Sequence, residues 1–434
     1  MNILIHLLTL VIVIVGIAVL VALPWPGLAA LVLLLVAWMA STRTGRQAWS
    51  VTRVGLATIP QRLGASSVIV VGIAGVVGVL VALLAMGEGF RHTLQQTGDA
   101  DTVIVLRGGA TAELSSGVSR EDAVLIEQQA GILKDAQGKP IASPELVVVA
   151  NIPKKGTGTD ANVEIRGVGQ QAFALRPNVR IIEGKAFTPG LRELVVGRGA
   201  VAQFVGLAPG STLNLANQQW TVTGVFESGD AHESEVWGDV ETVSTTYRRQ
   251  GYQSVTVRLT SPEAIDTFKA SLASDPRLKV DAKTTGDYYS AQSENLTTAI
   301  RVIGIVIGSI MAIGAVFGAL NTMYAAVATR AREIATLRAI GFRGAPVIVS
   351  ILLETMLLAL AGGLLGAAIA WVIFNNYTVS TLGSNFSQVV FSFKVSPELV
   401  WNGLKWALAI GFVGGLYPAL RAARLPVTTA LRES

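Results

Sequence analysis

Four long apolar blocks stand out along the chain, separated by segments in which polar and apolar residues alternate. The blocks are Ser67–Met86, Val302–Ala328, Val347–Phe374 and Trp401–Leu420. A helix needs about 20 apolar residues to cross a bilayer, and each block is close to that length. The pattern therefore predicts a membrane protein with four core transmembrane helices.

Two further apolar blocks open the chain, Ile3–Leu23 and Gly27–Ser41, and Pro24-Trp25-Pro26 joins them. Proline does not continue a helix, and tryptophan is typical of a membrane interface. We interpret residues 1–41 as a transmembrane hairpin. The alternative is a cleaved signal peptide, but the block lacks a Lys or Arg before it and is longer than the apolar core of a signal peptide.

The segment 87–296 alternates like an ordinary folded domain, and we expect an α+β fold in two lobes. Glu145–Asn151 and Glu193–Gly197 are typical of strands, and a helix is expected to follow Ser119 as its N-cap. Another helix, starting near Asp287, is expected to continue into the next span. The predicted fold class is therefore membrane α-helical with an α+β domain between the first two core spans.

The arginines of the short connections predict the orientation. Segments 42–66, 329–346 and 421–434 carry four, four and three arginines, whereas 24–26 and 375–397 carry only Lys394. Positive connections stay in the cytoplasm, so both termini are expected there, in a bacterial inner membrane, with the large domain periplasmic. The domain plan is a hairpin 1–41, a cytoplasmic amphipathic segment 42–66, spans 67–86, 297–328, 347–374 and 398–420, a periplasmic domain 87–296, a cytoplasmic coupling helix 329–346, a short periplasmic loop 375–397 and a cytoplasmic tail 421–434.

Composition narrows the class further. Apolar residues make up 51% of the 434 residues and charged residues 15%, against roughly 25% charged in soluble proteins. This excludes a disordered chain and a purely cytosolic enzyme. The chain has no cysteine, which excludes disulfides and thiolate catalysis.

Motifs for catalysis or cofactor binding are absent from the sequence. It contains no G-x-x-x-x-G-K-[ST] for nucleotide phosphates and no G-x-S-x-G elbow. The acidic stretch Asp230, His232, Glu233, Glu235 and Asp239 is the nearest approach to a metal site, and we favour a solvated loop over a cation site there. No cofactor or metal on this chain and no nucleic-acid partner are expected.

Small and ionisable residues within the spans are further candidates. Gly304, Gly308, Gly314 and Gly318 form two G-x-x-x-G pairs, which let helices pack closely within one chain or between two, and both interpretations stay open. Glu354 lies inside a span, where ionisable residues are functional candidates by default. For Glu354 a structural interhelical role and a mechanistic role both remain open.

A short amphipathic helix is predicted where the second core span ends. Ile334, Leu337 and Ile340 recur every third residue, charged residues surround them, and Gly341 is typical of the position after a helix. Such a helix contacts either a protein partner or lipid headgroups. From these physical considerations, neither interpretation is favoured.

At these residues the sequence resembles the MacB/FtsX family of ABC-transporter permeases. R-A-R-E-I-A-T-L-R-A-I-G-F at Arg330–Phe342 resembles the coupling helix of that family, and G-G-L-Y-P-A-L-R-A-A-R-L-P-V-T-T-A-L-R at Gly414–Arg432 resembles its terminal segment. E-L-V-V-G-R-G-A-V-A-Q-F-V-G-L at Glu193–Leu207 is similar to the MacB-type periplasmic region. The resemblance implies a dimer of permeases whose coupling helices contact ABC ATPase subunits through Arg330, Arg332, Glu333, Ile334, Thr336, Leu337, Arg338, Ile340, Gly341 and Phe342.

The resemblance also implies a function. The ATPase, with its ATP and Mg²⁺, is expected on a separate subunit, and its movement would be transmitted through rigid spans to the periplasmic domain. We expect export of a hydrophobic or amphiphilic cargo such as a drug, peptide, glycolipid or lipoprotein, with a periplasmic adaptor and an outer-membrane channel. The alternative is an FtsX-like signalling permease that regulates a periplasmic partner without moving cargo. Leu337→Asp is expected to disrupt the ATPase contact, and Arg330→Gln, as a rim charge, to matter less.

Overall fold

The computed structural model describes residues 15–20, 22–383, 387–424 and 426. The chain divides into two compact units. The helical unit comprises the described residues up to Gly87, Ala299–Asn376 and those from Lys394 onward. The α/β unit comprises Glu88–Thr298 and Tyr377–Phe393.

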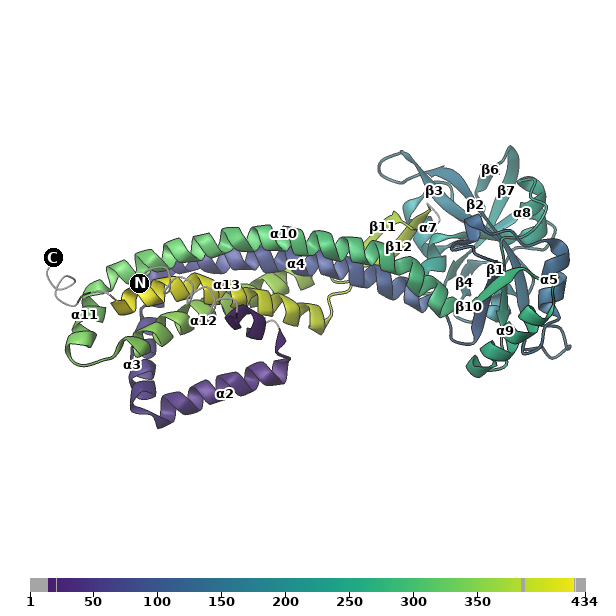
Figure 1. Cartoon of the computed structure of the whole chain (residues 1–434). Coiled ribbons are helices and arrows are strands. Elements are labelled where there is room, and N and C mark those ends of the chain that lie inside the picture. The colour runs from purple at the N-terminus through teal and green to yellow at the C-terminus, as the bar shows by residue number, and fades with distance from the viewer. Residues whose placement is uncertain (1–14, 21, 384–386, 425, 427–434) are drawn as a thin grey trace. The chain divides into compact units, whose positions relative to one another are not determined.

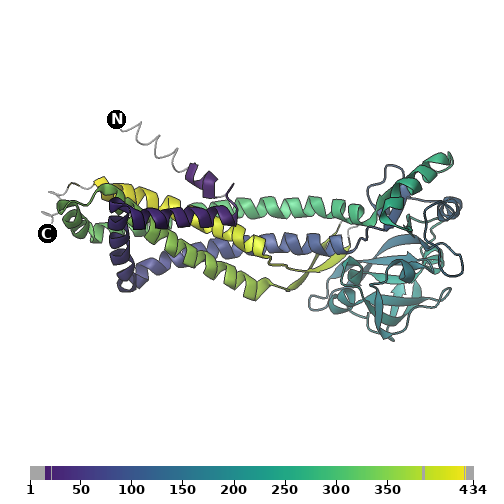
Figure 2. The ribbon, with the colours of Figure 1, turned by 90° about the horizontal axis from the view of Figure 1, so that it is seen from below.

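Four long apolar helices form the core of the helical unit (Figures 1 and 2). They are α4 (Leu63–Gln96), α10 (Thr285–Thr329), α12 (Gly344–Phe374) and α13 (Pro397–Arg424). By length and composition each is able to cross a membrane. The four predicted core spans are therefore confirmed as helices.

Two of these helices are longer than the predicted spans. α4 and α10 each contribute residues to both units without a break. The predicted helix from Asp287 into the second core span is confirmed, because α10 begins at Thr285 and continues to Thr329.

The helices of the helical unit pack through small residues. A Cβ atom on Gly411 of α13 would lie 2.5 Å from Cβ of Ala359 on α12, and one on Gly362 of α12 would lie 2.7 Å from the carbonyl oxygen of Val70 on α4. Real side chains do not tolerate such distances. Glycine at these positions therefore sets the separation of α12 from its two neighbours.

The predicted N-terminal hairpin lies only partly within the described residues. Most of its first arm lies outside the described residues, and the second arm corresponds to α2 (Trp25–Ser41). α2 and α3 (Arg43–Ala57) meet at 104°, and only taken together do they satisfy the length and composition of a span. The hairpin stays a prediction. α3 is amphipathic as predicted for this segment and packs against α12 through Ala48, Thr52 and Gly55.

The α/β unit is built on one continuous path of hydrogen-bonded strands. The order is β10-β1-β9-β2-β3-β8-β5-β7-β4, and β6 pairs with β7. β2 changes partner within its length, because residues 142–145 pair with β9 and residues 146–153 with β3. Two groups of strands therefore join at Glu145 and Leu146. The strands are β1 (Thr102–Arg107), β2 (Ala142–Pro153), β3 (Asp160–Val168), β4 (Arg180–Gly184), β5 (Glu193–Gly197), β6 (Thr212–Leu215), β7 (Gln218–Glu227), β8 (Val236–Asp239), β9 (Ser254–Arg258) and β10 (Val280–Thr284).

Short helices accompany the sheet. They are α5 (Arg120–Glu127), α6 (Ala172–Leu175), α7 (Arg198–Gln203), α8 (Val240–Thr246) and α9 (Ile265–Ser274). The predicted cap of α5 is confirmed, since the hydroxyl oxygen of Ser119 accepts a hydrogen bond from the amide of Asp122 at 3.0 Å. The predicted strand Glu193–Gly197 is β5, with the same bounds.

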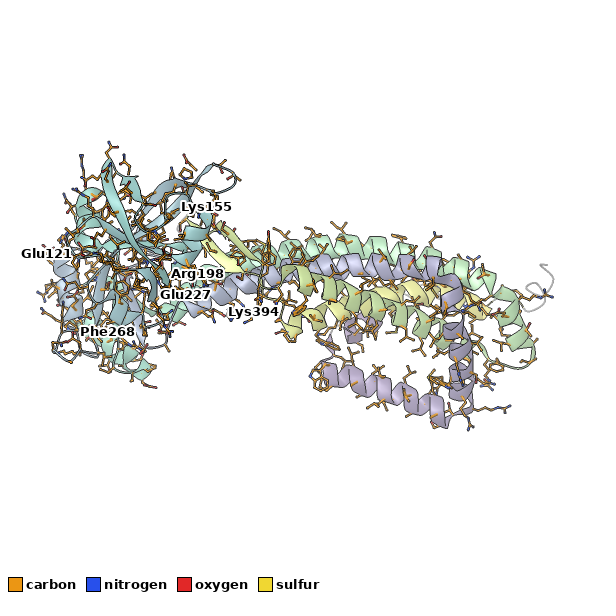
Figure 3. The ribbon with its side chains drawn as sticks, turned by 180° about the vertical axis from the view of Figure 1, so that it is seen from behind. Glu121, Lys155, Arg198, Glu227, Phe268 and Lys394 are labelled. Carbon is orange, nitrogen blue, oxygen red and sulfur yellow. The ribbon has the colours of Figure 1, made fainter. Side chains whose placement is uncertain are left out.

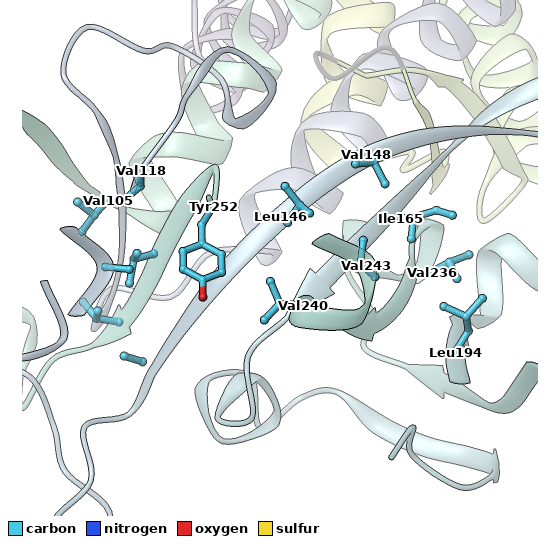
Figure 4. Packing of buried hydrophobic residues seen from close by; sticks show 14 of the residues in the cluster. Val105, Val118, Leu146, Val148, Ile165, Leu194, Val236, Val240, Val243 and Tyr252 are labelled. Atoms are coloured by element: carbon cyan, nitrogen blue, oxygen red, sulfur yellow. The ribbon is translucent and has the colours of Figure 1, made fainter. Parts of the chain in front are cut away.

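One apolar core underlies both groups of strands. Val105 of β1, Leu146 and Val148 of β2, Ile165 of β3 and Val236 of β8 are all buried in it (Figure 4). A smaller cluster contains Val195, Phe226 and Trp237. In β2 and β3 the core residues stand two apart, Leu146 and Val148 in one strand and Val163 and Ile165 in the other, as expected for one face of a strand.

The segment predicted as a short loop between the last two spans carries a β-hairpin, β11 (Thr378–Leu382) and β12 (Gln388–Ser392). It belongs to the α/β unit. The amide of Val390 donates to Ser234 Oγ at 2.8 Å, and the Phe391 ring packs edge-on against Phe90 at 5.4 Å. This hairpin therefore attaches the connection between α12 and α13 to the α/β unit.

Candidate coupling site

The coupling segment forms a separate short helix, α11 (Ala331–Ala339), after a single non-helical residue, Arg330. Its end is fixed by Gly341, whose φ is 102°. The amide of Phe342 donates to the carbonyl of Leu337 at 3.1 Å, and that of Gly341 donates to Arg338 at 3.2 Å. These two bonds form a Schellman motif. The predicted end of the helix at Gly341 is confirmed.

The apolar residues of α11 do not share one environment. Ile334 is buried within the helical unit, Leu337 is half-buried, and Ile340 is 70% exposed. The expectation that all three face a partner as one row is wrong for Ile334, which packs inward. The exposed side of the segment instead consists of Arg332, Glu333, Thr336, Ala339, Ile340 and Gly341.

A groove open to solvent lies on the inner side of α11. α3 contributes Val51 and Val54, α10 contributes Met323, and α11 contributes Leu337. The groove also reaches Arg62, Arg330 and Glu354. The packing of α11 against the rest of the helical unit is therefore incomplete around Leu337.

Glu354 of α12 is 3% exposed and is paired with two arginines. Arg62 Nη2 donates to Glu354 Oε1 at 2.7 Å, and Arg330 Nη1 donates to Oε2 at 3.0 Å. Arg330 Nη2 also donates to the carbonyl of Gly55 at 3.0 Å and to Thr58 Oγ1. We call these residues, Gly55, Thr58, Arg62, Arg330 and Glu354, the Glu354 clamp.

The clamp corrects one expectation. Arg330 is not a rim side chain, because its exposed side-chain fraction is 17% and it is bonded to three other parts of the helical unit. For Glu354 the interhelical role is realised. The arginine partners of Glu354 could not be predicted from sequence spacing, since Arg62 precedes Glu354 by 292 residues.

The two glycine pairs of α10 have different surroundings. A Cβ on Gly304 or Gly308 would lie 3.5 or 3.1 Å from side-chain atoms of Leu83 or Leu80, so this pair packs against α4 within the chain. Around Gly314 and Gly318 nothing described lies within 4 Å of such a Cβ. The sequence treats the pairs as equivalent, whereas only the first has an intrachain role among the described residues.

Close packing of α12 and α13 was not assigned to particular residues from the sequence. Gly411 and Gly415 of α13 carry it, whereas Gly362 and Gly366 of α12 pack against α4. Both pairs have the G-x-x-x-G spacing that drew attention to α10. The G-x-x-x-G spacing can be read from the sequence, but it does not indicate which helix a glycine pair packs against.

The acidic stretch of the α/β unit is not a solvated loop, and that expectation is wrong. Asp230, His232, Glu235 and Asp239 are all buried. Asp230 accepts hydrogen bonds from Ser228 Oγ at 2.6 Å and Asn178 Nδ2 at 2.9 Å. Among the described residues, no group of three or more His, Asp or Glu side chains is arranged to hold a metal ion.

Glu235 belongs to a larger buried cluster that surrounds Arg166 of β3. The guanidinium donates to four carboxylates: Glu113 at 2.8 Å, Glu145 at 3.0 Å, Glu164 at 2.7 Å and Glu235 at 2.8 Å. Arg176 pairs with Glu145 at 2.7 Å. We call these six residues the Arg166 cluster. It lies at the point where β2 changes partner, because Glu145 is the last residue of β2 that pairs with β9.

Charge pairing in the Arg166 cluster lowers the pKa of two of its carboxylates, Glu145 and Glu235. Burial alone would raise the pKa of Glu145, but the charges of Arg176 and Arg166 and a hydrogen bond from Arg176 outweigh it and lower the pKa to about 2. Burial would likewise raise the pKa of Glu235. The charge of Arg166 outweighs this effect, and the pKa of Glu235 is lowered. Buried charges are tolerated only when paired in this way.

Two protein families match successive parts of the chain. Residues 66–275 match the family described as MacB-like periplasmic core domain, and residues 305–427 match the FtsX-like permease C-terminal family. The macrolide export ATP-binding/permease protein MacB of Burkholderia pseudomallei (strain 1710b) is 26% identical over 397 residues, which cover 84% of this chain and 56% of that protein. MacB of Bordetella avium (strain 197N) is 25% identical, with 84% and 57% covered. The chain spans about half the length of the curated relatives it matches.

Two solved structures are similar to part of the chain. The periplasmic region of MacB from Actinobacillus actinomycetemcomitans is 14% identical with a TM-score of 0.34, and covers 43% of this chain and 90% of its own. The extracellular domain of the noncanonic ABC-type transporter YknZ from Gram-positive bacteria is 14% identical with a TM-score of 0.33, and covers 42% of this chain and all of its own.

Proposed function

Because the chain belongs to the MacB/FtsX-like ABC-transporter permeases, we propose that it receives ATPase-driven movement at α11 and transmits it to the α/β unit. ATP and Mg²⁺ are bound by a separate ABC ATPase subunit in this proposal. The observation that carries it is the exposed side of α11. It presents Ile340, 70% exposed, among the polar residues Arg332, Glu333 and Thr336, which is the composition of an interface centre with a polar rim.

The transmission path follows the chain. Arg330 and α11 come directly after α10, which continues without a break into the α/β unit. The hairpin β11–β12 gives a second connection, from α12 and α13. A push at α11 is thereby conveyed by elements that contribute to both units, and cargo needs no polar path through the spans.

The proposed activity is export, from the inner membrane of a bacterium, of a hydrophobic or amphiphilic cargo. A periplasmic adaptor and an outer-membrane channel complete the route. The match to a MacB-like periplasmic core domain supports this version over a signalling permease. The N- and C-termini lie in the cytoplasm in this arrangement, with α11.

Ile340→Asp tests the ATPase contact. The side chain is exposed, so the permease is expected to fold, while a charge at the centre of a desolvated contact is expected to lower recovery of the ATPase at least about tenfold. The measurement is co-purification of the ABC ATPase with the full chain from membranes, against Arg53→Gln as a control on exposed α3. Undiminished recovery with Ile340→Asp would mean that α11 is a lipid-bound helix.

Cargo movement separates the two versions of the function. Vesicles containing the permease and its ATPase are expected to accumulate an amphiphilic drug or lipopeptide when ATP is supplied. ATP hydrolysis that responds to the permease, with no cargo moved in any class tested, would favour the FtsX-like signalling alternative.

The proposed permease is a dimer whose contact includes α10. Only 22% of the apolar window of α10 is buried, against 39–44% for the other three spans, and its open side carries Gly314, Phe317 and Gly318. Phe317→Cys in the cysteine-free chain is expected to crosslink two permeases, while Val372→Cys on α12, also exposed, serves as the control. Crosslinking at Val372 and not at Phe317 would move the dimer contact away from α10.

A further inference from the structure

Three segments of the helical unit meet at one carboxylate. Glu354 comes from α12, Arg330 from the junction of α10 and α11, and Arg62 from the turn between α3 and α4. Each carboxylate oxygen accepts from a different arginine. Removal of Glu354 would therefore break the ion pairs of two segments with α12 at once.

Arg330 occupies the position that sets the direction of α11. It is the one residue between α10 and α11, with φ −105° and ψ 9°. Its guanidinium is held on one side by Glu354 and on the other by the Gly55 carbonyl and Thr58 Oγ1. Holding this side chain limits the angle at which α11 leaves α10.

Packing alone holds α11 only partly. Ile334 and Ala335 are buried, but the groove lies beside Leu337, and Ile340 is exposed. Charge-assisted hydrogen bonds are stronger and more directional than apolar contacts of the same size. The clamp therefore contributes the directional part of the attachment.

We propose that Glu354 is a positioning residue that holds α11 to α12 and to the turn after α3, so that displacement of α11 moves these segments together. The proposal rests on the proposed function in taking α11 as the element that is pushed. It differs from a purely stabilising ion pair, because it predicts a loss of transmission with the ATPase still bound.

The first test uses the purified full-length permease alone and so does not depend on the proposed function. A spin label attached through Ile340→Cys reports the mobility of α11. Glu354→Gln is expected to sharpen the label's spectrum, which indicates faster motion, while Arg53→Gln removes an exposed positive charge from α3 and should leave the spectrum unchanged. An unchanged spectrum in Glu354→Gln would overturn the proposal.

The second test measures transmission. With its ATPase, Glu354→Gln is expected to keep ATPase recovery within about twofold and to lose about tenfold of ATP-driven cargo movement. Arg330→Gln should lose a similar amount, and the double variant no more than the larger single loss, because both act through one contact. Additive losses would contradict the clamp as a unit.

Two further variants keep the inference testable if Glu354→Gln is poorly inserted. Arg62→Gln removes one of the two ion pairs and should give an intermediate spectrum. Glu354→Asp keeps the negative charge on a shorter side chain and should give a spectrum between those of the wild type and Glu354→Gln. If the wild-type chain binds no ATPase, the proposed function fails, whereas the spectra still decide whether Glu354 positions α11.

Discussion

The Glu354 clamp and the Arg166 cluster are both buried ion-pair networks, but their charges are balanced in opposite ways. The clamp has one carboxylate for two guanidinium groups, and the cluster has four carboxylates for two. The arginines of the clamp are 19% and 17% exposed, whereas Arg166 is 2% exposed. The guanidinium groups of the clamp are therefore more exposed than those of the cluster, where Arg176 is 11% exposed.

This difference has a physical consequence. A charge that keeps contact with water loses little when its partner moves away, whereas a sealed charge without its partner costs several kcal/mol. Loss of one pair is therefore expected to cost less in the clamp, whose arginines keep some contact with water, than in the cluster. The Arg166 cluster is suited to a junction that stays fixed, where β2 passes from β9 to β3.

The largest effect is expected for Arg166→Leu. The variant leaves four buried carboxylates facing one another with only Arg176 nearby, and we expect a loss of about 4 kcal/mol or more in the stability of the α/β unit. Protease resistance and thermal unfolding of the detergent-purified full chain measure it. A smaller loss than in Glu354→Gln would reverse the ranking of the two networks.

An intermediate effect is expected from acid. The pKa of Glu145 is lowered from 4.5 to about 2, so its contribution is present above about pH 4.5 and is lost as pH falls toward 2. The shift corresponds to about 3 kcal/mol. Unfolding of the α/β unit followed against pH should show this loss, and Glu145→Gln should be less stable at neutral pH with a shallower acid dependence. An equally steep acid dependence in Glu145→Gln would assign the loss to other groups.

The smallest effect is expected at an exposed pair of the same unit. Arg198 and Glu227 are 2.6 Å apart with side chains 58% and 42% exposed (Figure 3). Arg198→Gln should change stability by less than about 1 kcal/mol, because exposed ion pairs contribute little. The thermal unfolding measured for Arg166→Leu applies here too. A loss comparable with Arg166→Leu would show that burial is not what distinguishes the cluster.

Much of the secondary structure could be predicted because it depends on neighbours in the chain. The four spans follow from the length of their apolar blocks, the cap at Ser119 from its hydroxyl, and the end of α11 from a glycine that tolerates a φ of 102°. The strand Glu193–Gly197 likewise follows from a local apolar run. These features need no knowledge of what packs against them.

The surroundings of individual side chains were decided by the tertiary structure. Ile334 and Ile340 both belong to the apolar set at every third position, yet one is buried and the other exposed. The members of the Arg166 cluster are spread along the chain from Glu113 to Glu235. Arg62, a partner of Glu354, lies just before α4 and 292 residues before Glu354. Hydrophobic periodicity indicates which face of a helix or strand is buried. An ion pair depends on which distant segments come together, and periodicity does not indicate that.

The sequence by itself thus determined which four segments form apolar helices long enough to cross a membrane, which segment forms the folded domain, and where α11 ends, because hydrophobic length and backbone conformation are local properties. Only the tertiary structure decided that Arg330 is held inside the helical unit, that Glu235 of the acidic stretch pairs with Arg166, and that Gly304 packs against α4 while Gly314 stays open. Each of these features depends on a partner from another part of the chain. Buried ion pairs and close helix packing stabilise the protein only once those parts are in contact.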